Sequence, residues 1–376
     1  MAVPDLYQAL EFAHYAERFR DKIFVIALSR NTLFQDLVLD FKVLSAYRIK
    51  LVIIAADPGF ELEREVALSN THGTNFNLIQ THEPKSSESG GLKVNLSQIQ
   101  AALADGEMPI VVHHGLTPQT SGIESVEGLL TDIALGLQAN KILTVAQQIQ
   151  DLEDVLSRTR VSYEELQNLV NNKLRELDMA AYEPRLRFVQ TLLEHGIPEI
   201  AYVVGKPGHI CQEVFTHEGA GILFCRIEHT QIRQAELRDI SDITIQLRPQ
   251  IEARRILPVE ENTIVQNLQN FWVYEIDGQV VSVMCIKEYD DWVEIATGAT
   301  LFRDRKFGRA AELFMHLLDE AKKRNKKCVF GVSINPKLEK MLLPLGFREV
   351  EHRELPQAWQ EQYDFSRPSR VFALKL

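Results

Sequence analysis

The sequence predicts an α/β protein with two domains, a three-layer α/β/α sandwich followed by an α+β domain. Three observations support this. The chain has 376 residues, more than twice the usual domain of ~150 residues. Short apolar runs alternate with helical patterns in its first half, as in βαβ units. Three strand-like runs follow one another directly in its second half. A polar stretch at 228–240 separates the halves, so we assign 1–228 and 235–376 to the two domains.

Apolar runs in the first half are short and bounded by polar residues, which predicts strands, and the run 23–28 is typical of a buried parallel strand. These strands are expected at residues 23–28, 51–56, 109–114, 141–145, 200–204 and 221–227. Apolar residues at helical spacing predict helices between them, at 5–20, 34–47, 124–139 and over most of 151–195. The polar segment 81–91 has the composition of a loop. Helices on both faces of one sheet would make the three layers.

The second half has a different order of elements. A helix is expected at 236–253, and three consecutive strands span 271–302. Asp277-Gly278 between the first two strands predicts a type I′ hairpin, and Asp290-Asp291 predicts the next turn. The remaining elements are a helix at 308–325, a strand at 328–334, a short helix at 338–347 and a final strand at 370–376.

Composition excludes several classes of function. A net charge of −11 argues against a general nucleic-acid binder, and no apolar run is long enough to cross a membrane. The four cysteines form no C-x-x-C pair, and His113-His114 would point to opposite faces of a strand, so we expect no metal site. The N-terminus lacks an apolar signal core, which favours a cytoplasmic protein. The basic run 322–327 is interpreted as a solvated helix end rather than a nucleic-acid patch.

The most informative segment is the turn at 305–310, which follows a strand ending near Thr300 and opens a helix. Free N–H groups and the positive end of the helix dipole suit a pyrophosphate. Small residues at Gly308 and Ala310 would let the main chain approach such an anion closely. An ordinary strand-to-helix turn with solvated arginines is the alternative interpretation.

This turn and its surroundings resemble the GNAT superfamily of N-acetyltransferases over residues 235–376. Arg305, Gly308 and Ala310 match the R/Q-x-x-G-x-G/A loop that binds acetyl-CoA in that superfamily. The resemblance implies that acetyl-CoA is the acetyl donor and that the fourth and fifth strands of the domain splay apart to hold it. No metal is implied.

Further cofactor contacts follow from the same resemblance. Main-chain N–H groups after Thr300 would hold the pyrophosphate, together with the turn residues Phe307 and Arg309. Asn335 occupies the asparagine position that often follows the fifth strand. Leu342 stands where many members have a tyrosine general acid, so that role has no candidate here.

Four segments spread over the chain resemble bacterial N-acetylglutamate synthases. They are residues 13–28, 213–224, 231–243 and 355–376. This resemblance implies an amino-acid-kinase-like domain fused to a GNAT domain, and acetyl transfer to L-glutamate in the first step of arginine biosynthesis. It also implies a homo-oligomer built through the kinase-like domains.

The kinase-like half departs from its own pattern. Active kinases have K-x-G-G after the first strand, whereas the corresponding residues here are Ala27, Ser29 and Arg30. The second glycine cluster is replaced by residues 55–59. ATP phosphates therefore have no evident cradle, and we predict a scaffold or regulatory module without kinase activity.

A regulatory arginine site is suggested by the same family resemblance. Glu213, Gly219 and Gly221 match the motif that contributes to the arginine pocket of relatives, and a carboxylate suits a guanidinium. In the alternative interpretation, the glycines only serve a tight turn.

The acetyltransferase half supplies the remaining candidates. Glu294 matches the glutamate of the family's A-E-L strand and could take a proton from the acceptor amine; a solvated strand glutamate is the alternative. Arg367 and Ser369 match the R-x-S that helps relatives hold glutamate. The family's other arginine, however, falls near Val259-Glu260. This leaves open a different amine acceptor, or a non-catalytic sensor of arginine or acetyl-CoA.

Overall fold

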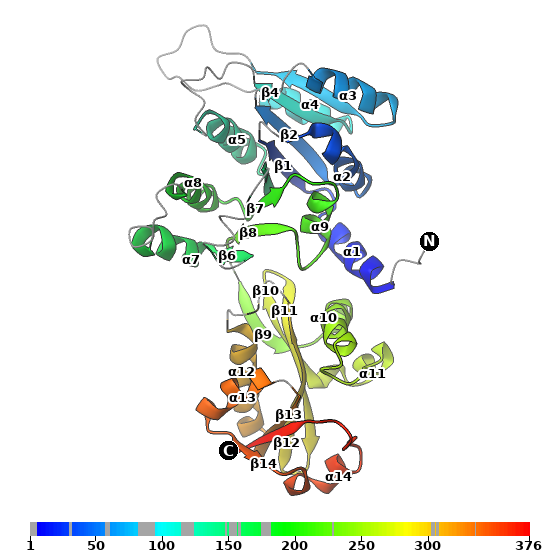
Figure 1. Cartoon of the computed structure of the whole chain (residues 1–376), viewed down its shortest axis with the longest axis vertical. Coiled ribbons are helices and arrows are strands. Elements are labelled where there is room, and N and C mark those ends of the chain that lie inside the picture. Colours follow the sequence, from blue (N-terminus) through cyan, green and yellow to red (C-terminus); the bar gives the residue numbers. More distant parts are fainter. Residues whose placement is uncertain are drawn as a thin grey trace. The chain divides into compact units, whose positions relative to one another are not determined.

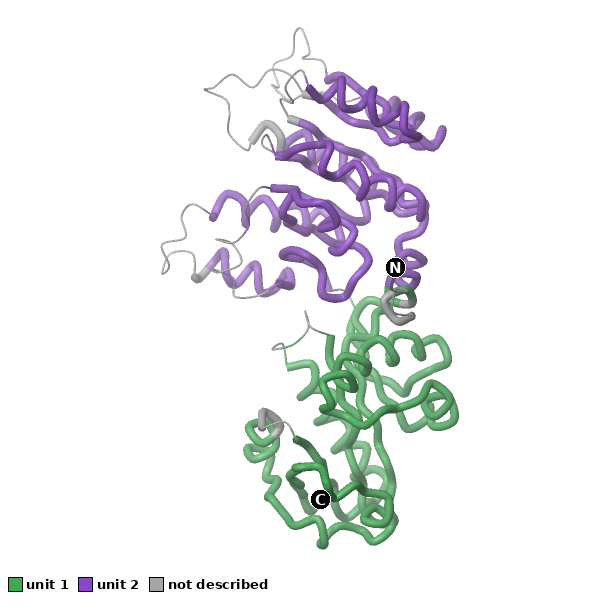
Figure 2. The backbone as a smooth tube through the Cα atoms, turned by 45° about the vertical axis from the view of Figure 1, so that its right-hand side comes forward, with its two compact units in different colours: residues 1–11, 228–376 green, residues 12–227 purple. Residues whose placement is uncertain are grey.

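A computed structural model describes most of the chain. The described residues are 6–29, 32–56, 61–81, 95–113, 124–146, 149, 156, 159–173, 182–227, 229–301, 305, 308–334 and 336–376. The chain divides into two compact units, residues 12–227 and residues 228–376 with 1–11 (Figure 2). Each unit is built around its own sheet.

The first unit contains a mainly parallel eight-stranded sheet in the order β3-β4-β2-β1-β5-β7-β8-β6 (Figure 1). Its strands are β1 (Ile23–Leu28), β2 (Lys50–Ala56), β3 (Phe76–Gln80), β4 (Met108–His113), β5 (Lys141–Ala146), β6 (Arg160–Ser162), β7 (Glu199–Val204) and β8 (Gly221–Cys225). Strand β8 runs antiparallel to its neighbour β7, and β6 pairs in parallel with β8. The six predicted apolar runs therefore form the inner strands of this sheet, and five of them, β4, β2, β1, β5 and β7, pair in parallel.

Helices cover both faces of this sheet and bury two apolar cores. One core includes residues of α1 (Leu6–Arg18), α2 (Phe34–Ala46), α3 (Glu61–Thr71) and α9 (His209–Phe215). The other includes residues of α4 (Leu96–Ala104), α5 (Glu124–Gly136), α7 (Tyr163–Asn168), the π-helix Leu169–Lys173 and α8 (Glu183–Glu194). Successive residues of β1 alternate between the cores, as a strand requires. The predicted three-layer sandwich is confirmed.

The second unit contains a seven-stranded sheet in the order β14-β15-β13-β12-β11-β10-β9. Its strands are β9 (Thr230–Gln234), β10 (Phe271–Ile276), β11 (Gln279–Tyr289), β12 (Trp292–Thr300), β13 (Cys328–Ser333), β14 (Arg348–Val350) and β15 (Arg370–Lys375). Its helices are α10 (Ile240–Glu252), α11 (Glu261–Gln266), α12 (Arg309–Lys323), α13 (Pro336–Leu342) and α14 (Gln357–Gln360). The mixture of a meander and packed helices confirms the predicted α+β class.

The predicted hairpin turn is confirmed in detail. Asp277 and Gly278 have φ angles of 47° and 83°, and a type I′ turn needs positive φ at both positions. Other elements escaped prediction, namely α3, β3, α4, β6, β9, α11, β14 and α14. Strand β9 falls between the two predicted domain ranges, and its pairing with β10 places it in the second sheet.

The junction motif at residues 231–243 has a structural explanation. The Arg233 guanidinium donates to both carboxylate oxygens of Asp239, at 2.6 and 2.8 Å, and its Nε donates to Glu275 on β10 at 2.9 Å. Such a bidentate pair fixes direction as well as distance. The arginine and aspartate of this motif therefore tie the start of the second unit to its sheet.

Candidate functional site

Strands β12 and β13 diverge, and this fork is the centre of the candidate site. Residues Trp292–Glu294 of β12 pair in parallel with Cys328–Phe330 of β13. The later described residues of the two strands do not pair with each other. Neighbouring parallel strands normally stay ~4.8 Å apart along their length. The predicted splay of these two strands is therefore present, and it begins directly after Glu294.

A β-bulge lies in the diverging part of β12. Ala296 pairs with Cys285 and Ala299 pairs with Val283, so two residues of β12 face one residue of β11. One of these two, Thr297, has a φ of 53°. A bulge takes main-chain groups out of the ladder. It therefore offers main-chain groups to a ligand at the fork.

The predicted phosphate-binding turn lies after β12. Gly308 adopts the left-handed conformation before the first residue of α12, Arg309, and the first helical bond runs from Glu312 N–H to the Gly308 carbonyl. The N–H groups preceding Glu312 have no partner within the helix, as at any helix start, and Ala310 is among them. Phe307 lies outside the described residues.

Thr300 and Arg305 lie beside each other at the end of β12. Arg305 Nε donates to the Thr300 carbonyl at 3.2 Å, and the Thr300 hydroxyl lies 2.9 Å from that of Ser282. Asn335, after β13, is outside the described residues. The structure thus brings Thr300 and Arg305 together shortly before α12 in the chain, and their binding of a cofactor stays a prediction.

The Arg309 side chain binds to another residue of the protein, Tyr274. Its guanidinium lies 5.3 Å from the centre of the Tyr274 ring and donates to the Tyr274 hydroxyl at 3.1 Å. That hydroxyl in turn donates to Glu312 at 2.7 Å, and burial together with this carboxylate raises the pKa of Tyr274. The predicted cofactor contact of Arg309 therefore rests on its main-chain N–H.

Glu294 is a buried carboxyl at the last paired position of the fork. Only 7% of the residue is exposed. Burial raises the pKa of Glu294, and the Lys287 ammonium and the polar atoms of Trp359 and Tyr289 act in the opposite direction. A raised pKa brings a carboxylate closer to the range in which it accepts protons effectively near neutral pH. The alternative of a solvated strand glutamate is therefore wrong.

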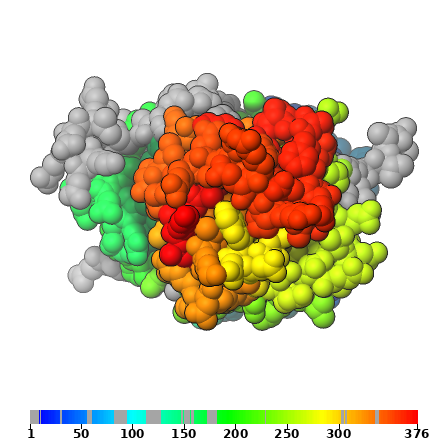
Figure 3. Space-filling model, turned by 90° about the horizontal axis from the view of Figure 1, so that it is seen from below, coloured from blue at the N-terminus to red at the C-terminus, as the bar shows by residue number. Residues whose placement is uncertain are grey.

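The C-terminal segment covers the face of the sheet on which Glu294 lies. Trp359 of α14 packs in one apolar cluster with Phe330 of β13, and its ring stacks on Tyr363 at 4.3 Å. The red C-terminal residues and the yellow β11–β12 region adjoin on the face in Figure 3. The segment that contacts Glu294 through Trp359 thus continues to the predicted acceptor residues Arg367 and Ser369.

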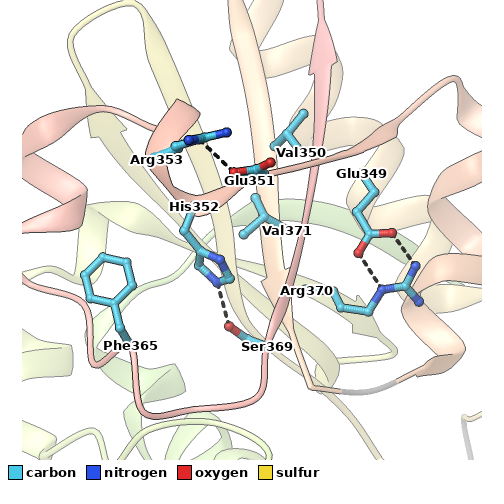
Figure 4. A pocket seen from close by; sticks show the side chains of 9 residues that line it. All are labelled: Glu349, Val350, Glu351, His352, Arg353, Phe365, Ser369, Arg370 and Val371. Atoms are coloured by element: carbon cyan, nitrogen blue, oxygen red, sulfur yellow. Dashed lines mark hydrogen bonds and ion pairs between the residues drawn. The ribbon is translucent and has the colours of Figure 1, made fainter.

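Ser369 is held in a hydrogen-bonded group beside a cavity of about 440 Å³ (Figure 4). Its Oγ lies 3.0 Å from His352 Nε2 and 2.5 Å from the Tyr363 hydroxyl. His352, Phe365 and Ser369 line this cavity, whereas Glu294 does not. His352 stacks on Trp359 and Tyr363, with ring centres 6.2 and 5.7 Å away, and Trp359 in turn contacts Glu294.

Arg367 contacts the loop that follows α10. Its Nη2 donates to the Arg255 carbonyl, in the loop after α10, at 3.4 Å. Of the two residues at the family's second arginine position, Val259 packs on the α10 core and Glu260 is exposed before α11. The Arg367 side chain thus contacts the main chain four residues before Val259.

The predicted regulatory residue Glu213 belongs to a buried ion cluster. Lys141 Nζ lies 3.0 Å from Glu199 and 3.6 Å from Glu213, and Arg18 lies 3.3 Å from Glu199. Burial opposes ionisation, but Lys141 and Arg18 lower the pKa of Glu199 to about 2. The cluster carries two cations and two carboxylates. Its other three members, Arg18, Lys141 and Glu199, were not identified from the sequence because they come from distant segments.

The two predicted glycines have clear conformational reasons. Gly219 has a φ of 62°, and a Cβ on Gly221 would lie 1.9 Å from the Tyr202 carbonyl oxygen of the neighbouring strand. The Ala220 N–H between them donates to Glu213 at 3.0 Å. A tight turn with close strand packing accounts for both glycines, and this supports the alternative interpretation.

The kinase-like unit has little room for phosphate where β1 ends. The Ser29 N–H donates to the Val145 carbonyl, and the Ser29 and Thr32 hydroxyls bond each other at 2.8 Å. A Cβ on Gly205 would lie 2.9 Å from the Thr32 methyl, so these segments pack closely. Arg30, residues 57–59 of the second cluster and His114 lie outside the described residues, as does most of the expected loop 81–91.

The basic run at the end of α12 is neutralised by nearby carboxylates. Lys326 pairs with Glu288 and Lys327 with Asp291, each at 2.5 Å. Because α12 has 15 residues, the run lies about 22 Å from the turn at the start of the helix. The interpretation as a solvated helix end is therefore favoured.

Searches for other classes of site cover the described residues only. Within these residues, no group of three or more His, Cys, Asp or Glu side chains is arranged to hold a metal ion. No helix in this part of the chain combines the length and apolar character needed to cross a membrane. The fork in the second sheet is therefore the best-developed site that the structure describes.

Comparisons with known proteins find sequence relatives named amino-acid acetyltransferase. No protein-family profile matches the chain. The amino-acid acetyltransferase of Vibrio cholerae is 25% identical over 260 residues, which are 66% of this chain and 58% of that protein. That of Neisseria meningitidis serogroup B is 27% identical over 61% of this chain and 52% of its own length. That of Ralstonia nicotianae is 22% identical over 76% of this chain and 63% of its own length. The chain thus spans somewhat over half the length of these curated relatives.

A solved structure matches the whole chain. N-acetylglutamate synthase from Neisseria gonorrhoeae, complexed with coenzyme A and L-arginine, superimposes over 100% of both chains with a TM-score of 0.60 and 18% identity. The chain is therefore similar in sequence to amino-acid acetyltransferases and has the fold of an N-acetylglutamate synthase. The resemblance predicted from the four segments is confirmed.

Proposed function

We propose that this chain is an N-acetyltransferase that moves acetyl from acetyl-CoA to the α-amine of L-glutamate. The observation that carries the proposal is the buried carboxyl of Glu294 at the point where β12 and β13 separate. The relatives named amino-acid acetyltransferase and the matching synthase crystallised with coenzyme A support the same reaction.

The donor would lie along the fork with its pyrophosphate at the start of α12. The first N–H groups of that helix point away from the helix body and lie at the positive end of its dipole. Arg305 adds a cation next to the end of β12. Phe307 and Asn335 complete the cofactor residues that the GNAT resemblance implies.

Glu294 would act as the general base. The acceptor amine must lose a proton before it attacks the thioester carbonyl, and Glu294 takes that proton directly or through water. Main-chain N–H groups at the β12 bulge are suited to stabilise the oxyanion of the tetrahedral intermediate. The intermediate then expels the CoA thiolate, and no acetyl-enzyme forms. Position 342 is a buried leucine, and α13 (PKLEKML) contains no tyrosine that could protonate that thiolate.

The acceptor would lie between the fork and the C-terminal segment. Arg367 suits a carboxylate because its guanidinium can bind in a bidentate manner, and Ser369 adds a hydroxyl. Both residues come from the segment whose Trp359 lies near Glu294. A substrate that carries both an amine and carboxylates meets these requirements.

The first unit would regulate rather than catalyse. Its closed β1 end favours the absence of kinase activity, and Glu213 in its ion cluster is the residue that the family resemblance assigns to an arginine site; the synthase of Neisseria gonorrhoeae is complexed with L-arginine. The family resemblance further suggests a cytoplasmic homo-oligomer assembled through these units.

An acceptor panel tests the proposed reaction. Release of the CoA thiol would be measured with amino acids and polyamines, with and without arginine. We expect L-glutamate to turn over best, with loss of activity as the pH falls through the raised pKa of Glu294. Faster turnover of a polyamine would refute the proposed acceptor. A stable acetylated protein formed from acetyl-CoA alone would refute direct transfer.

A further inference from the structure

A lysine lies beside the candidate base, on the neighbouring strand and the same face of the sheet. Lys287 on β11 lies directly opposite Glu294 on β12, and the two residues share one face because they are paired in register. The Lys287 ammonium lies 3.9 Å from Glu294 Oε2. The lysine side chain is 49% exposed, whereas the carboxyl is almost fully buried. A ligand can therefore reach the cation beside the base.

We propose that Lys287 binds the α-carboxylate of the acceptor and thereby selects α-amino acids; this rests on the proposed acetyl transfer. In an α-amino acid the nitrogen and the carboxylate carbon are about 2.5 Å apart, given the bond lengths to Cα. An acceptor whose amine approaches Glu294 would place its carboxylate next to an ammonium 3.9 Å from the same carboxyl. The pair thus complements both charged groups of the acceptor.

The count of charges around the site supports this assignment. Glutamate brings two carboxylates, whereas the family's second arginine position is occupied here by Val259-Glu260 and supplies no cation. Lys287 supplies a cation at the base itself, which leaves Arg367 for the side-chain carboxylate. An amine without a neighbouring carboxylate, such as a polyamine, would offer Lys287 no carboxylate besides that of Glu294.

The alternative is an ordinary cross-strand ion pair. Such pairs on a sheet surface contribute only about 0.2–1 kcal/mol to stability, and their removal has no reason to discriminate between acceptors. Discrimination between two acceptors that differ only at the α-carboxylate therefore separates the two explanations.

The test compares L-glutamate with its α-amide, which keeps the α-amine and the side-chain carboxylate. We expect Lys287→Met to lower kcat/KM for glutamate about tenfold to a hundredfold, as for loss of a charge-assisted hydrogen bond, and to leave the α-amide almost unaffected. Lys287→Arg, which keeps the charge, should restore part of the loss. Lys326→Met removes a lysine paired with Glu288 and serves as the matched control.

Equal losses with both acceptors would overturn the assignment, because Lys287 would then act only through Glu294. Calorimetric binding of glutamate and its α-amide provides a second measurement that needs no turnover. If the native protein released no CoA with any acceptor, the proposed reaction would be wrong, and binding would still test the lysine. Unchanged glutamate affinity in Lys287→Met would reject its role.

Discussion

Each unit contains a pair of adjacent parallel strands at its centre, and the two pairs end differently. In the first unit β1 pairs with β5 throughout, and Ser29 extends the contact to Val145 beyond the end of β1. In the second unit β12 leaves β13 after three pairs and carries a bulge. A continuous ladder uses its main-chain groups within the sheet, whereas a fork leaves them for a ligand. The difference explains why the described acceptor and donor candidates gather in the second unit.

The largest expected effect comes from the buried carboxyl at the fork. Glu294→Gln keeps the shape of the side chain but removes its ability to accept a proton, so we expect kcat to fall by a factor of about 10²–10⁴. CoA release at saturating acetyl-CoA and glutamate measures this change.

Glu288→Gln is the matched control on the neighbouring strand. Hydrogen bonds from Lys326 and Arg324 lower the pKa of Glu288, so it is ionised and already paired. Its amide variant should retain activity. If Glu294→Gln were as active as Glu288→Gln, the fork would lose its role as a catalytic site.

The sequence predicted the fold because local patterns were consistent with the packing. The run 23–28 is apolar throughout since β1 is buried on both faces, and Asp277-Gly278 suits a turn that needs positive φ. Strand β9 was missed because its residues are mostly exposed at the edge of a sheet, and their composition resembles that of a linker. Edge strands carry a weak apolar signal.

The site was predictable only in part. The turn around Gly308 and the position of Glu294 follow from motifs in continuous segments. The burial of Glu294 depends on a separate segment, since Trp359 lies 65 residues further along the chain. Lys287 and Lys141 likewise acquire their importance from cross-strand and long-range pairing, which sequence periodicity does not reveal.

The close packing of the first unit gives the next largest effect. Gly221→Ala would place a Cβ 1.9 Å from the Tyr202 carbonyl oxygen, so β7 and β8 must separate. We expect a loss of about 2–4 kcal/mol in the free energy of unfolding, measured by denaturant titration. Gly128→Ala in α5 meets nothing within 4 Å and should instead stabilise by about 0.5–1 kcal/mol. Equal effects would show that the strand contact is looser than described.

The ion cluster of the first unit predicts a pH dependence of stability. Lys141 and Arg18 lower the pKa of Glu199 from 4.5 to about 2 despite its burial. A lowered pKa stabilises the folded state above pH 4.5, and this contribution disappears as the pH falls toward 2. We expect an acid-dependent loss on the order of 1–3 kcal/mol in the native protein, reduced in Glu199→Gln. Parallel pH profiles for the two proteins would contradict this assignment.

The smallest expected effect sharpens the comparison at the fork. Arg305 is exposed and lies beside the Thr300 carbonyl, so Arg305→Ala removes one cation without opening a core. We expect acetyl-CoA affinity to fall about tenfold, while glutamate affinity stays the same, because main-chain N–H groups of α12 remain in place. Arg324→Ala at the far end of α12 is the control and should change neither affinity, since Arg324 pairs with Glu288 and Glu320. Calorimetry with each ligand separates the outcomes. An acetyl-CoA affinity that is unaffected by Arg305→Ala would place the diphosphate elsewhere. The fork would then lose the ligand that distinguishes it from the closed end of β1.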